Sequence, residues 1–224
     1  MTLAIELLVS AQRHYLTKSK AKTMKLGGLL TLFAISSILV ACKPEAQNSA
    51  PENTPETPER PDTPELPENP LSTLEEDIEV IFNGDNSLCY ADCFGDYYHT
   101  GNYMWGIFFQ QYTSKEQIYV EIMHPEHIYE IPLGCYTTSD DINSTNVLIK
   151  GGFDVDGYQS YSWYTRLKSG DRAGATAPIF GGSITIENIG DELYRTTFDL
   201  IDDRGNKIAG TYEGRMILED FRIN

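Results

Sequence analysis

The chain of 224 residues carries 17 basic and 33 acidic side chains, which gives a formal net charge of −16. This acidic excess excludes a nucleic-acid-binding protein that neutralises phosphates, and it excludes attachment to an anionic membrane surface by charge alone. With 41% apolar and 22% charged residues, the composition also excludes collagen, a coiled coil and a membrane protein with many spans. The length leaves room for one domain of ordinary size together with unfolded segments.

Residues 1–41 are predicted to be an export signal. Residues 26–41 form an uncharged apolar run that is shorter than the roughly 20 residues needed to cross a bilayer core, which is typical of a signal segment. Positive charge precedes this run at Lys18, Lys20, Lys22 and Lys25. Because residues 1–23 would make an unusually long positive region, we expect translation to begin at Met24.

The end of this run, Leu39-Val40-Ala41-Cys42, resembles the bacterial lipobox. The resemblance implies that the Cys42 sulfur receives a diacylglycerol, that the chain is cut just before Cys42, and that the new amino terminus is acylated by a fatty acid such as palmitate. Several acyl chains hold a protein on a bilayer far better than one chain does. Pro44 at the sorting position favours the outer membrane, on either its periplasmic or its cell-surface side. The alternative is a buried helix that ends in an unrelated cysteine, and the proline-rich stretch after it argues against that.

After the lipidated cysteine, residues 42–77 are predicted to be a disordered, acidic tether. Almost none of the side chains are apolar, so the segment cannot bury enough surface to offset chain entropy. Proline favours an extended chain at ~3.1 Å per residue, which would place the domain roughly 100 Å from the membrane. The alternative, a ligand for an SH3-like domain, is disfavoured because acids flank the prolines. The prolines are Pro44, Pro51, Pro55, Pro58, Pro61, Pro64, Pro67 and Pro70.

From residue 78 to residue 224 the apolar pattern has a period close to two, which predicts an all-β domain. Three alternating runs separated by turn residues predict an antiparallel meander at 182–188, 192–201 and 206–218. Roughly eight to ten strands at this spacing predict a single antiparallel barrel or sandwich, with a lipocalin-like barrel among the forms expected. The other expected strands lie at 78–82, 87–93, 103–111, 117–123, 135–138, 146–150 and 158–168.

Four segments of this domain resemble a group of bacterial outer-membrane lipoproteins that have one C-terminal β domain. The segments are DYYHTGN at 96–102 followed by Trp105, PIFGGSITI at 178–186, FDLIDDRGNKI at 198–208 and GTYEG at 210–214. The resemblance covers most of residues 90–220. It implies the fold and the location, and it implies no activity.

Three cysteines, Cys89, Cys93 and Cys135, remain in an oxidising compartment and permit one disulfide. If residues 87–93 are extended, Cys89 and Cys93 lie ~13 Å apart, which exceeds the reach of a disulfide. A bond from one of them to Cys135 is therefore expected. Asp92 and Asp96 would oppose the low thiol pKa that nucleophilic catalysis needs.

Histidine patterns do not predict a catalytic or a metal site. His124 and His127 have acidic neighbours, but Pro125 prevents the helix on which a zinc motif of this type depends. His99 near Asp96 has the residue types of an acid–base pair, yet no nucleophile stands at a recognisable spacing. We therefore expect a protein that is not an enzyme.

Paired acids raise the question of calcium, because carboxylate oxygens are the ligands that Ca²⁺ prefers. No complete calcium-binding loop follows any of the pairs, and Asp-Gly is ordinary turn chemistry. We therefore expect no metal and no other cofactor. The pairs are Asp140-Asp141, Asp154 with Asp156, and Asp202-Asp203.

Aromatic residues are more numerous than one core needs. The simpler interpretation is packing between two sheets, and the more specific one is a platform that stacks on sugars or lines an apolar cavity. The sequence thus predicts a non-enzymatic envelope module that binds a glycan or a small apolar ligand. The alternatives are a structural or protein-interaction component of an envelope complex, and a hydrolase without a recognisable motif. The platform candidates are Tyr97, Tyr98, Tyr103, Trp105, Tyr158, Tyr161 and Trp163.

Overall fold

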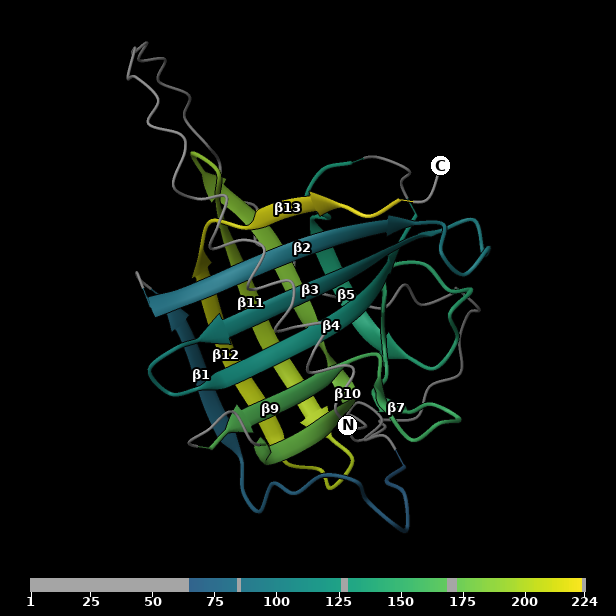
Figure 1. Ribbon diagram of the computed structural model, residues 1–224, viewed down its shortest axis with the longest axis vertical. Coiled ribbons are helices and arrows are strands. Elements are labelled where there is room, and N and C mark those ends of the chain that lie inside the picture. The colour runs from purple at the N-terminus through teal and green to yellow at the C-terminus, as the bar shows by residue number, and fades with distance from the viewer. Residues whose placement is uncertain (1–64, 84–85, 126–128, 169–172, 223–224) are drawn as a thin grey trace, which may run out of the picture. The chain divides into compact units, whose positions relative to one another are not determined.

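The computed structural model describes residues 65–83, 86–125, 129–168 and 173–222. These residues form an all-β fold with no α-helix, as the period-two pattern predicts (Figure 1). None of them forms a helix long and apolar enough to cross a bilayer. The strands are β1 (Ile78–Asn83), β2 (Ser87–Gly95), β3 (Tyr103–Gln111), β4 (Glu116–His124), β5 (Gly134–Ser139), β6 (Val147–Ile149), β7 (Gly152–Phe153), β8 (Gln159–Ser160), β9 (Trp163–Leu167), β10 (Ala173–Gly190), β11 (Leu193–Asp202), β12 (Lys207–Gly214) and β13 (Ile217–Asp220).

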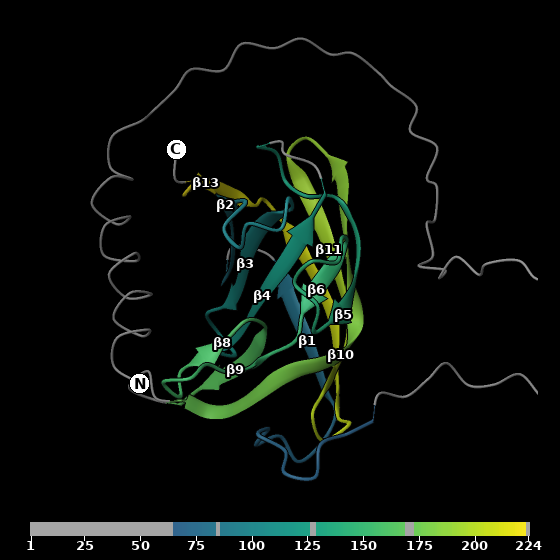
Figure 2. The same cartoon turned by 90° about the vertical axis from the view of Figure 1, so that its right-hand side faces the viewer.

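Five strands close a small barrel. β10 pairs with β5, β5 with β6, β6 with β4, β4 with β9, and β9 pairs back with β10. The sheet continues beyond this ring through β11, β12 and β1 in one direction, and through β3, β2 and β13 in the other. Figure 2 shows the two extensions as layers that face each other. The predicted barrel or sandwich is thus confirmed as a barrel with two sandwich-like extensions.

β10 belongs to both layers because it bends in the middle. Its first part pairs with β9 and its second part with β11 and β5, and the register shifts between Ile179 and Gly181 (Figure 2). Gly182 has a φ of 91°, and a Cβ there would lie 2.0 Å from the Asp199 carbonyl oxygen. Only glycine fits so close an approach of two backbones, so Gly182 fixes the place of the bend.

The meander is confirmed as β10, β11 and β12, but some predicted details are wrong. Three strand pairs are parallel: β1 with β12, β13 with β2, and β5 with β6. β1 and β13 are not joined to their partners by hairpins, so turn signals cannot reveal their direction. The predicted strand at 158–168 is divided, because Tyr161 has a φ of 64° and lies between β8 and β9.

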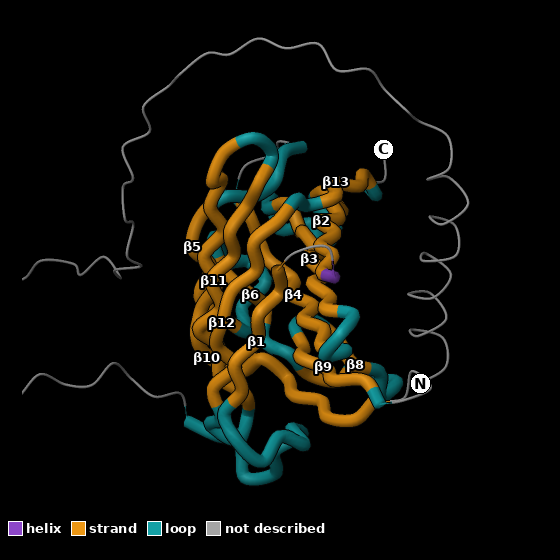
Figure 3. Tube along the Cα trace, turned by 90° about the vertical axis from the view of Figure 1, so that its left-hand side faces the viewer, coloured by secondary structure: helices purple, strands orange, loops and turns teal. Residues whose placement is uncertain are grey.

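Aromatic rings fill the space between the layers. Phe109 packs against Phe198 and Tyr212 with ring centroids 5.0 and 5.3 Å apart, and Phe82 lies 5.9 Å from Phe198. Trp105 is also fully buried. Small barrels are filled by side chains in this way. The loops gather at the two ends of the layers (Figure 3), and candidate sites are best sought there and on the outer faces.

Residues 71–77, which the composition assigns to the tether, are bound to the folded domain, and we call this segment the strap. The backbone N–H groups of Leu71 and Ser72 donate to the Asp203 carboxylate. The Ser72 hydroxyl donates to Asp202 at 2.6 Å. The carboxylates of Asp202 and Asp203 thus hold the start of the strap against the β11–β12 turn.

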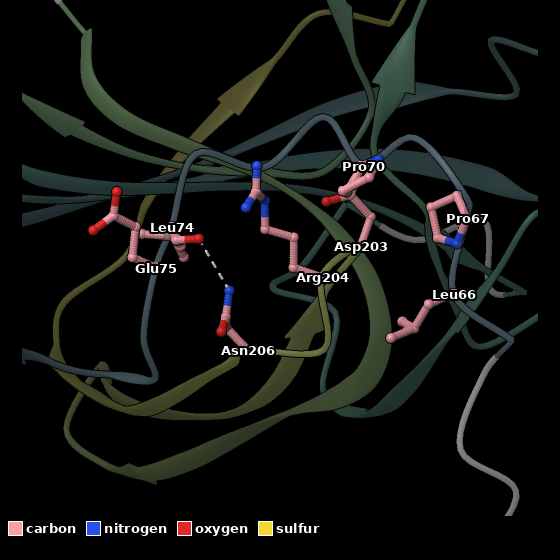
Figure 4. A pocket seen from close by; sticks show the side chains of 8 residues that line it. All are labelled: Leu66, Pro67, Pro70, Leu74, Glu75, Asp203, Arg204 and Asn206. Atoms are coloured by element: carbon pink, nitrogen blue, oxygen red, sulfur yellow. Dashed lines mark hydrogen bonds between the residues drawn. The ribbon is translucent and has the colours of Figure 1, made fainter.

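The strap also inserts an apolar side chain. Leu74 is 4% exposed and belongs to the main core. The Asn206 side chain donates to the Leu74 carbonyl oxygen at 3.2 Å, beside a shallow pocket of about 330 Å³ (Figure 4). The folded part therefore begins before residue 78. Composition alone places the start of the folded part too late, because the strap is acidic and contains only a few apolar and hydroxyl side chains.

Candidate functional site

The structure separates the seven aromatic residues predicted to form one platform. Trp105 and Trp163 are buried, and Tyr103 packs against the main core. Tyr158 is exposed near the β7–β8 hairpin. Residues two apart on a strand share a face, so Tyr103 and Trp105 are drawn into the core together. A single platform made of all seven is not formed.

Three of the seven do gather, on the outer face of the β3–β4 region. Tyr98 and Tyr161 pack against a small cluster built on Met104 and Met123. The rings of Tyr97 and Tyr98 meet edge to face with centroids 5.0 Å apart. The sequence singled out these tyrosines, but it did not indicate the buried acid that lies beneath them.

That acid is Glu121, which is 9% exposed on the outer face of β4. It accepts hydrogen bonds from the Tyr98 hydroxyl at 2.9 Å and from the Tyr119 hydroxyl at 3.3 Å. Burial raises the pKa of the Glu121 carboxyl, and the two hydrogen bonds act in the opposite direction. A Cβ on Gly106 would lie 2.6 Å from the Tyr119 hydroxyl oxygen, so glycine on β3 makes room for this ring.

A second acid, Asp92, stands level with Glu121 on the far side of Gly106. Burial, and then the neighbouring Glu219, raise the pKa of Asp92 to about 7. Its Oδ1 atom is buried and has no hydrogen-bond partner among the described residues. Two strand spacings separate Asp92 and Glu121, about 10 Å between Cα atoms. The Tyr119 ring occupies the space over Gly106, so these acids do not face an open cleft of the kind a glycosidase needs.

A groove of about 530 Å³ lies at the end of the molecule where the β10–β11 hairpin ends and β13 begins. This volume is within the range of small-ligand sites, and the mouths of barrels are frequent places for them. Seven apolar or aromatic side chains form most of its walls. They are Tyr129, Ile131, Leu133, Tyr194, Met216, Ile217 and Leu218.

The aromatic wall of the groove is held rigidly. Tyr129 stacks on buried Trp105 with a centroid distance of 6.4 Å and an interplanar angle of 15°. The guanidinium of Arg222 also lies over the Tyr129 ring, 4.9 Å from its centroid. Arg222 is itself fixed by Asp220 at 2.7 Å. The ring is therefore in place before any ligand arrives, which lowers the cost of binding.

The rim of the groove contains a strained turn. Asp191 and Glu192 connect β10 to β11 with φ values of 47° and 62°. A two-residue hairpin turn of this hand normally carries glycine at its second position. Glu192 lines the rim and approaches Arg215 at 3.8 Å, with both side chains mostly exposed. Backbone strain of this kind is often retained at functional sites.

The predicted disulfide from Cys89 or Cys93 to Cys135 is wrong, because Cys89 and Cys93 are both free. Their sulfurs lie on the inward face of β2, with Ala91 between them, and are buried in the core. Strand alternation directs both thiols away from the surface, while Cys135 is the second residue of β5. Burial raises the pKa of the Cys89 thiol well above its usual value, which opposes thiolate chemistry.

Within the described part of the chain, the histidines considered from the sequence as metal ligands or acid–base groups do not form such a site. His124 is buried and its Nδ1 lies 2.9 Å from the Tyr136 hydroxyl, on the face of β4 opposite to Glu121. His127 lies outside the described residues. Asp96 caps its own turn by accepting from the N–H groups of Thr100 and Gly101, and His99 is exposed.

One carboxylate of each acid pair accepts hydrogen bonds from nearby groups of the protein. Asp141 accepts from Asn143, Asp154 accepts from the backbone of Tyr158, and Asp202 accepts from the backbone of Asn206. Among the described residues, no group of three or more acids, histidines or cysteines comes together around a metal-sized space. The lipobox residues Leu39, Val40, Ala41 and Cys42 lie outside the described part of the chain.

Sequence reasoning missed the groove because its walls come from three distant segments. Residues 129–133, 188–194 and 215–218 carry no motif, and only their adjacency makes a site. Two signals were present: the tyrosines Tyr129 and Tyr194, and a glutamate at a turn position that favours glycine. Comparisons with models of known protein families, with curated proteins and with solved structures found no match.

Proposed function

We propose that this chain is a lipid-anchored protein of the bacterial outer membrane whose β domain binds an apolar ligand in the groove. The observation that carries the proposal is the groove itself, in which mostly apolar side chains line a volume of about 530 Å³. Its floor is continuous with the main core through Ile131 and Met216. The domain acts as a binding module, and no catalytic step is assigned to it.

The location rests on the signal-like segment and on the resemblance of residues 39–42 to a lipobox. Cys42 supplies the thioether, and the proline-rich tether allows the domain to reach away from the bilayer. Expression in a bacterium with labelled palmitate tests this. The wild-type chain takes up label and stays with the outer membrane, while Cys42→Ser takes up none and is released. Label that persists in Cys42→Ser contradicts the proposal.

Binding in the groove is tested with the mature chain and the fluorescent apolar probe N-phenyl-1-naphthylamine. Leu133 is 47% exposed and lines the groove, so Leu133→Glu places a charge among apolar groups and weakens probe binding at least about tenfold. Leu193 is 40% exposed on the nearby hairpin and does not line the groove, so Leu193→Glu is the matched control. Equal binding by the two variants, or no binding by the wild type, overturns the proposal.

A second candidate function, a protein-interaction component of an envelope complex, is favoured by exposed rings outside the groove. Phe94 stacks on Phe221 with a centroid distance of 5.5 Å, and Tyr97 meets Phe94 edge to face. Tyr97 and Phe221 are both about half exposed. Crosslinking from a photoreactive residue at position 97 in living cells distinguishes this candidate, because it captures a protein partner only if this patch is an interface.

A further inference from the structure

β13 is an edge strand with one side free. It pairs with β2 and lies at the end of the sheet (Figure 1). Among the described residues no other strand pairs with it, and no backbone bond outside the sheet involves Ile217–Asp220. A free edge of this kind is a template for another strand.

The direction of its backbone groups follows from the register. The N–H group of Phe221, directly after β13, donates to the Cys93 carbonyl oxygen on β2 at 2.9 Å. Backbone groups alternate in direction along a strand, so those of Ile217 and Glu219 also point to β2. The N–H and C=O groups of Leu218 and Asp220 therefore point to the free side.

The groove runs along this free edge. Met216, Ile217 and Leu218 are consecutive, and all three line the groove. Side chains of consecutive residues on a strand point to opposite faces, so a groove that touches all three follows the edge of the backbone. Leu218 turns inward and packs against the core, while Ile217 shares its face with Tyr90 on β2.

The outer face at this edge carries two acids, and neither forms an ion pair with another described residue. Glu219 lies beside Asp92 in the β13–β2 register, and the Oδ1 atom of Asp92 is buried without a partner. Like charges placed opposite each other on a sheet are destabilising. The base nearest in sequence, Arg222, is engaged by Asp220. A residue on a strand added next to β13 would lie directly beside Glu219.

We propose that the ligand of the groove is an extended peptide that adds to the free edge of β13, with apolar side chains facing the groove and a lysine or arginine between them beside Glu219. The proposal rests on the groove being the binding site and names the ligand class. Main-chain hydrogen bonds to Leu218 and Asp220 supply affinity, and alternate side chains supply specificity. The basic side chain pairs with Glu219 and offsets part of the repulsion between Glu219 and Asp92.

The first test uses a fluorescein-labelled synthetic peptide of sequence Thr-Val-Lys-Val-Thr and the mature full chain, measured by fluorescence polarisation. Two further probes carry N-methyl groups on the odd-numbered or on the even-numbered residues. A strand bound by one edge uses one of these two sets of N–H groups. We expect one probe to bind about 10- to 30-fold more weakly and the other to bind as the parent does. Equal affinity of all three probes overturns the proposal.

The second test changes the protein. Leu218→Pro removes the N–H on the free side, where proline is tolerated on an edge strand. Leu218→Ala removes the same side-chain contacts but keeps the N–H. We expect Leu218→Pro to bind the parent peptide at least about fivefold more weakly than Leu218→Ala, with similar thermal unfolding of the two variants. If Leu218→Pro unfolds, the pair of N-methyl probes decides the question with the wild type.

The charge is tested by Glu219→Gln against the same peptide with norleucine in place of lysine. Glu219→Gln weakens binding of the lysine peptide about three- to tenfold and leaves the norleucine peptide unchanged. Glu213→Gln on β12 is the matched control, because that carboxylate pairs with Arg195 away from the groove. If Glu219→Gln lowers the affinity for both peptides equally, the lysine does not lie beside Glu219.

Three outcomes separate this inference from the proposed function. If N-phenyl-1-naphthylamine binds in the groove and no peptide does, the groove remains a ligand site and the peptide assignment falls. If sedimentation shows that the wild type is a dimer and Leu218→Pro is a monomer, a second copy of the chain occupies the edge of β13. The peptide assignment then also falls. If neither probe binds, both proposals fail.

Discussion

The two turns that bound β11 each contain two consecutive acids, yet the two ends of this strand are built differently. At its end, Asp202 and Asp203 are buried under the strap, and their oxygens accept hydrogen bonds from it. At its beginning, Asp191 and Glu192 are exposed in a left-handed turn. Two consecutive acids bind the strap at one turn, and at the other turn they adopt a strained backbone conformation at the rim of the groove. The difference lies in whether another segment of the chain covers the turn.

The largest effect is expected from removing the hydrogen bonds between Asp202 and the strap. Asp202 is fully buried and accepts from the Ser72 hydroxyl and from the backbone N–H groups of Arg204 and Asn206. Asp202→Ala leaves these donors unsatisfied, so we expect the free energy of unfolding to fall by about 3 kcal/mol. Urea unfolding followed by circular dichroism measures this. Asp199→Ala, at an exposed position on the same strand, is the control and changes stability by less than about 0.5 kcal/mol.

An intermediate effect on stability is expected at Asp92, whose buried Oδ1 atom has no hydrogen-bond partner among the described residues, in contrast to Asp202. The pKa of Asp92 is raised to about 7, so the folded state holds this proton more tightly than the unfolded state does. Below pH 4 the carboxyl is protonated in both states. Between pH 4 and pH 7 stability falls as pH rises, and above pH 7 the loss is complete.

Asp92→Asn removes this loss. A fully buried group with this shift would correspond to about 4 kcal/mol. Asp92 is only partly buried and solvent screens it, so we expect the variant to be more stable than the wild type by about 1–2 kcal/mol at pH 8. At pH 3.5 the two should be equal. A difference that is the same at both pH values contradicts the assigned ionisation.

The smallest effect concerns the strained rim. Glu192 has a φ of 62°, a conformation that costs an ordinary side chain about 1 kcal/mol relative to glycine. Glu192→Gly should therefore raise the free energy of unfolding by about 1 kcal/mol. Glu187→Gly lies within β10, where glycine weakens a strand, and should lower stability. If Glu192→Gly is also destabilising, strain does not distinguish the two turns.

Much of the sheet follows from local patterns, and the site does not. Alternation along 192–201 predicts β11 within a residue or two, because one buried face is enough to produce the pattern. The closure of the barrel depends on Gly182 and on the approach of two backbones, which no local pattern encodes. The same applies to the groove, where Tyr129 and Tyr194 become neighbours only after the layers have formed.

The strap has an orienting consequence. It meets the domain beside Asp202 and Asp203, at the foot of β11, and Tyr194 at the head of that strand lines the groove, roughly 30 Å away at the rise of an extended chain. If Cys42 is attached to a bilayer as we propose, the strap is the point at which the β domain is joined to its anchor, at the opposite end of β11 from the groove. Under that proposal the groove would lie far from the point of attachment, so attachment to the bilayer would leave β13 accessible to the proposed peptide.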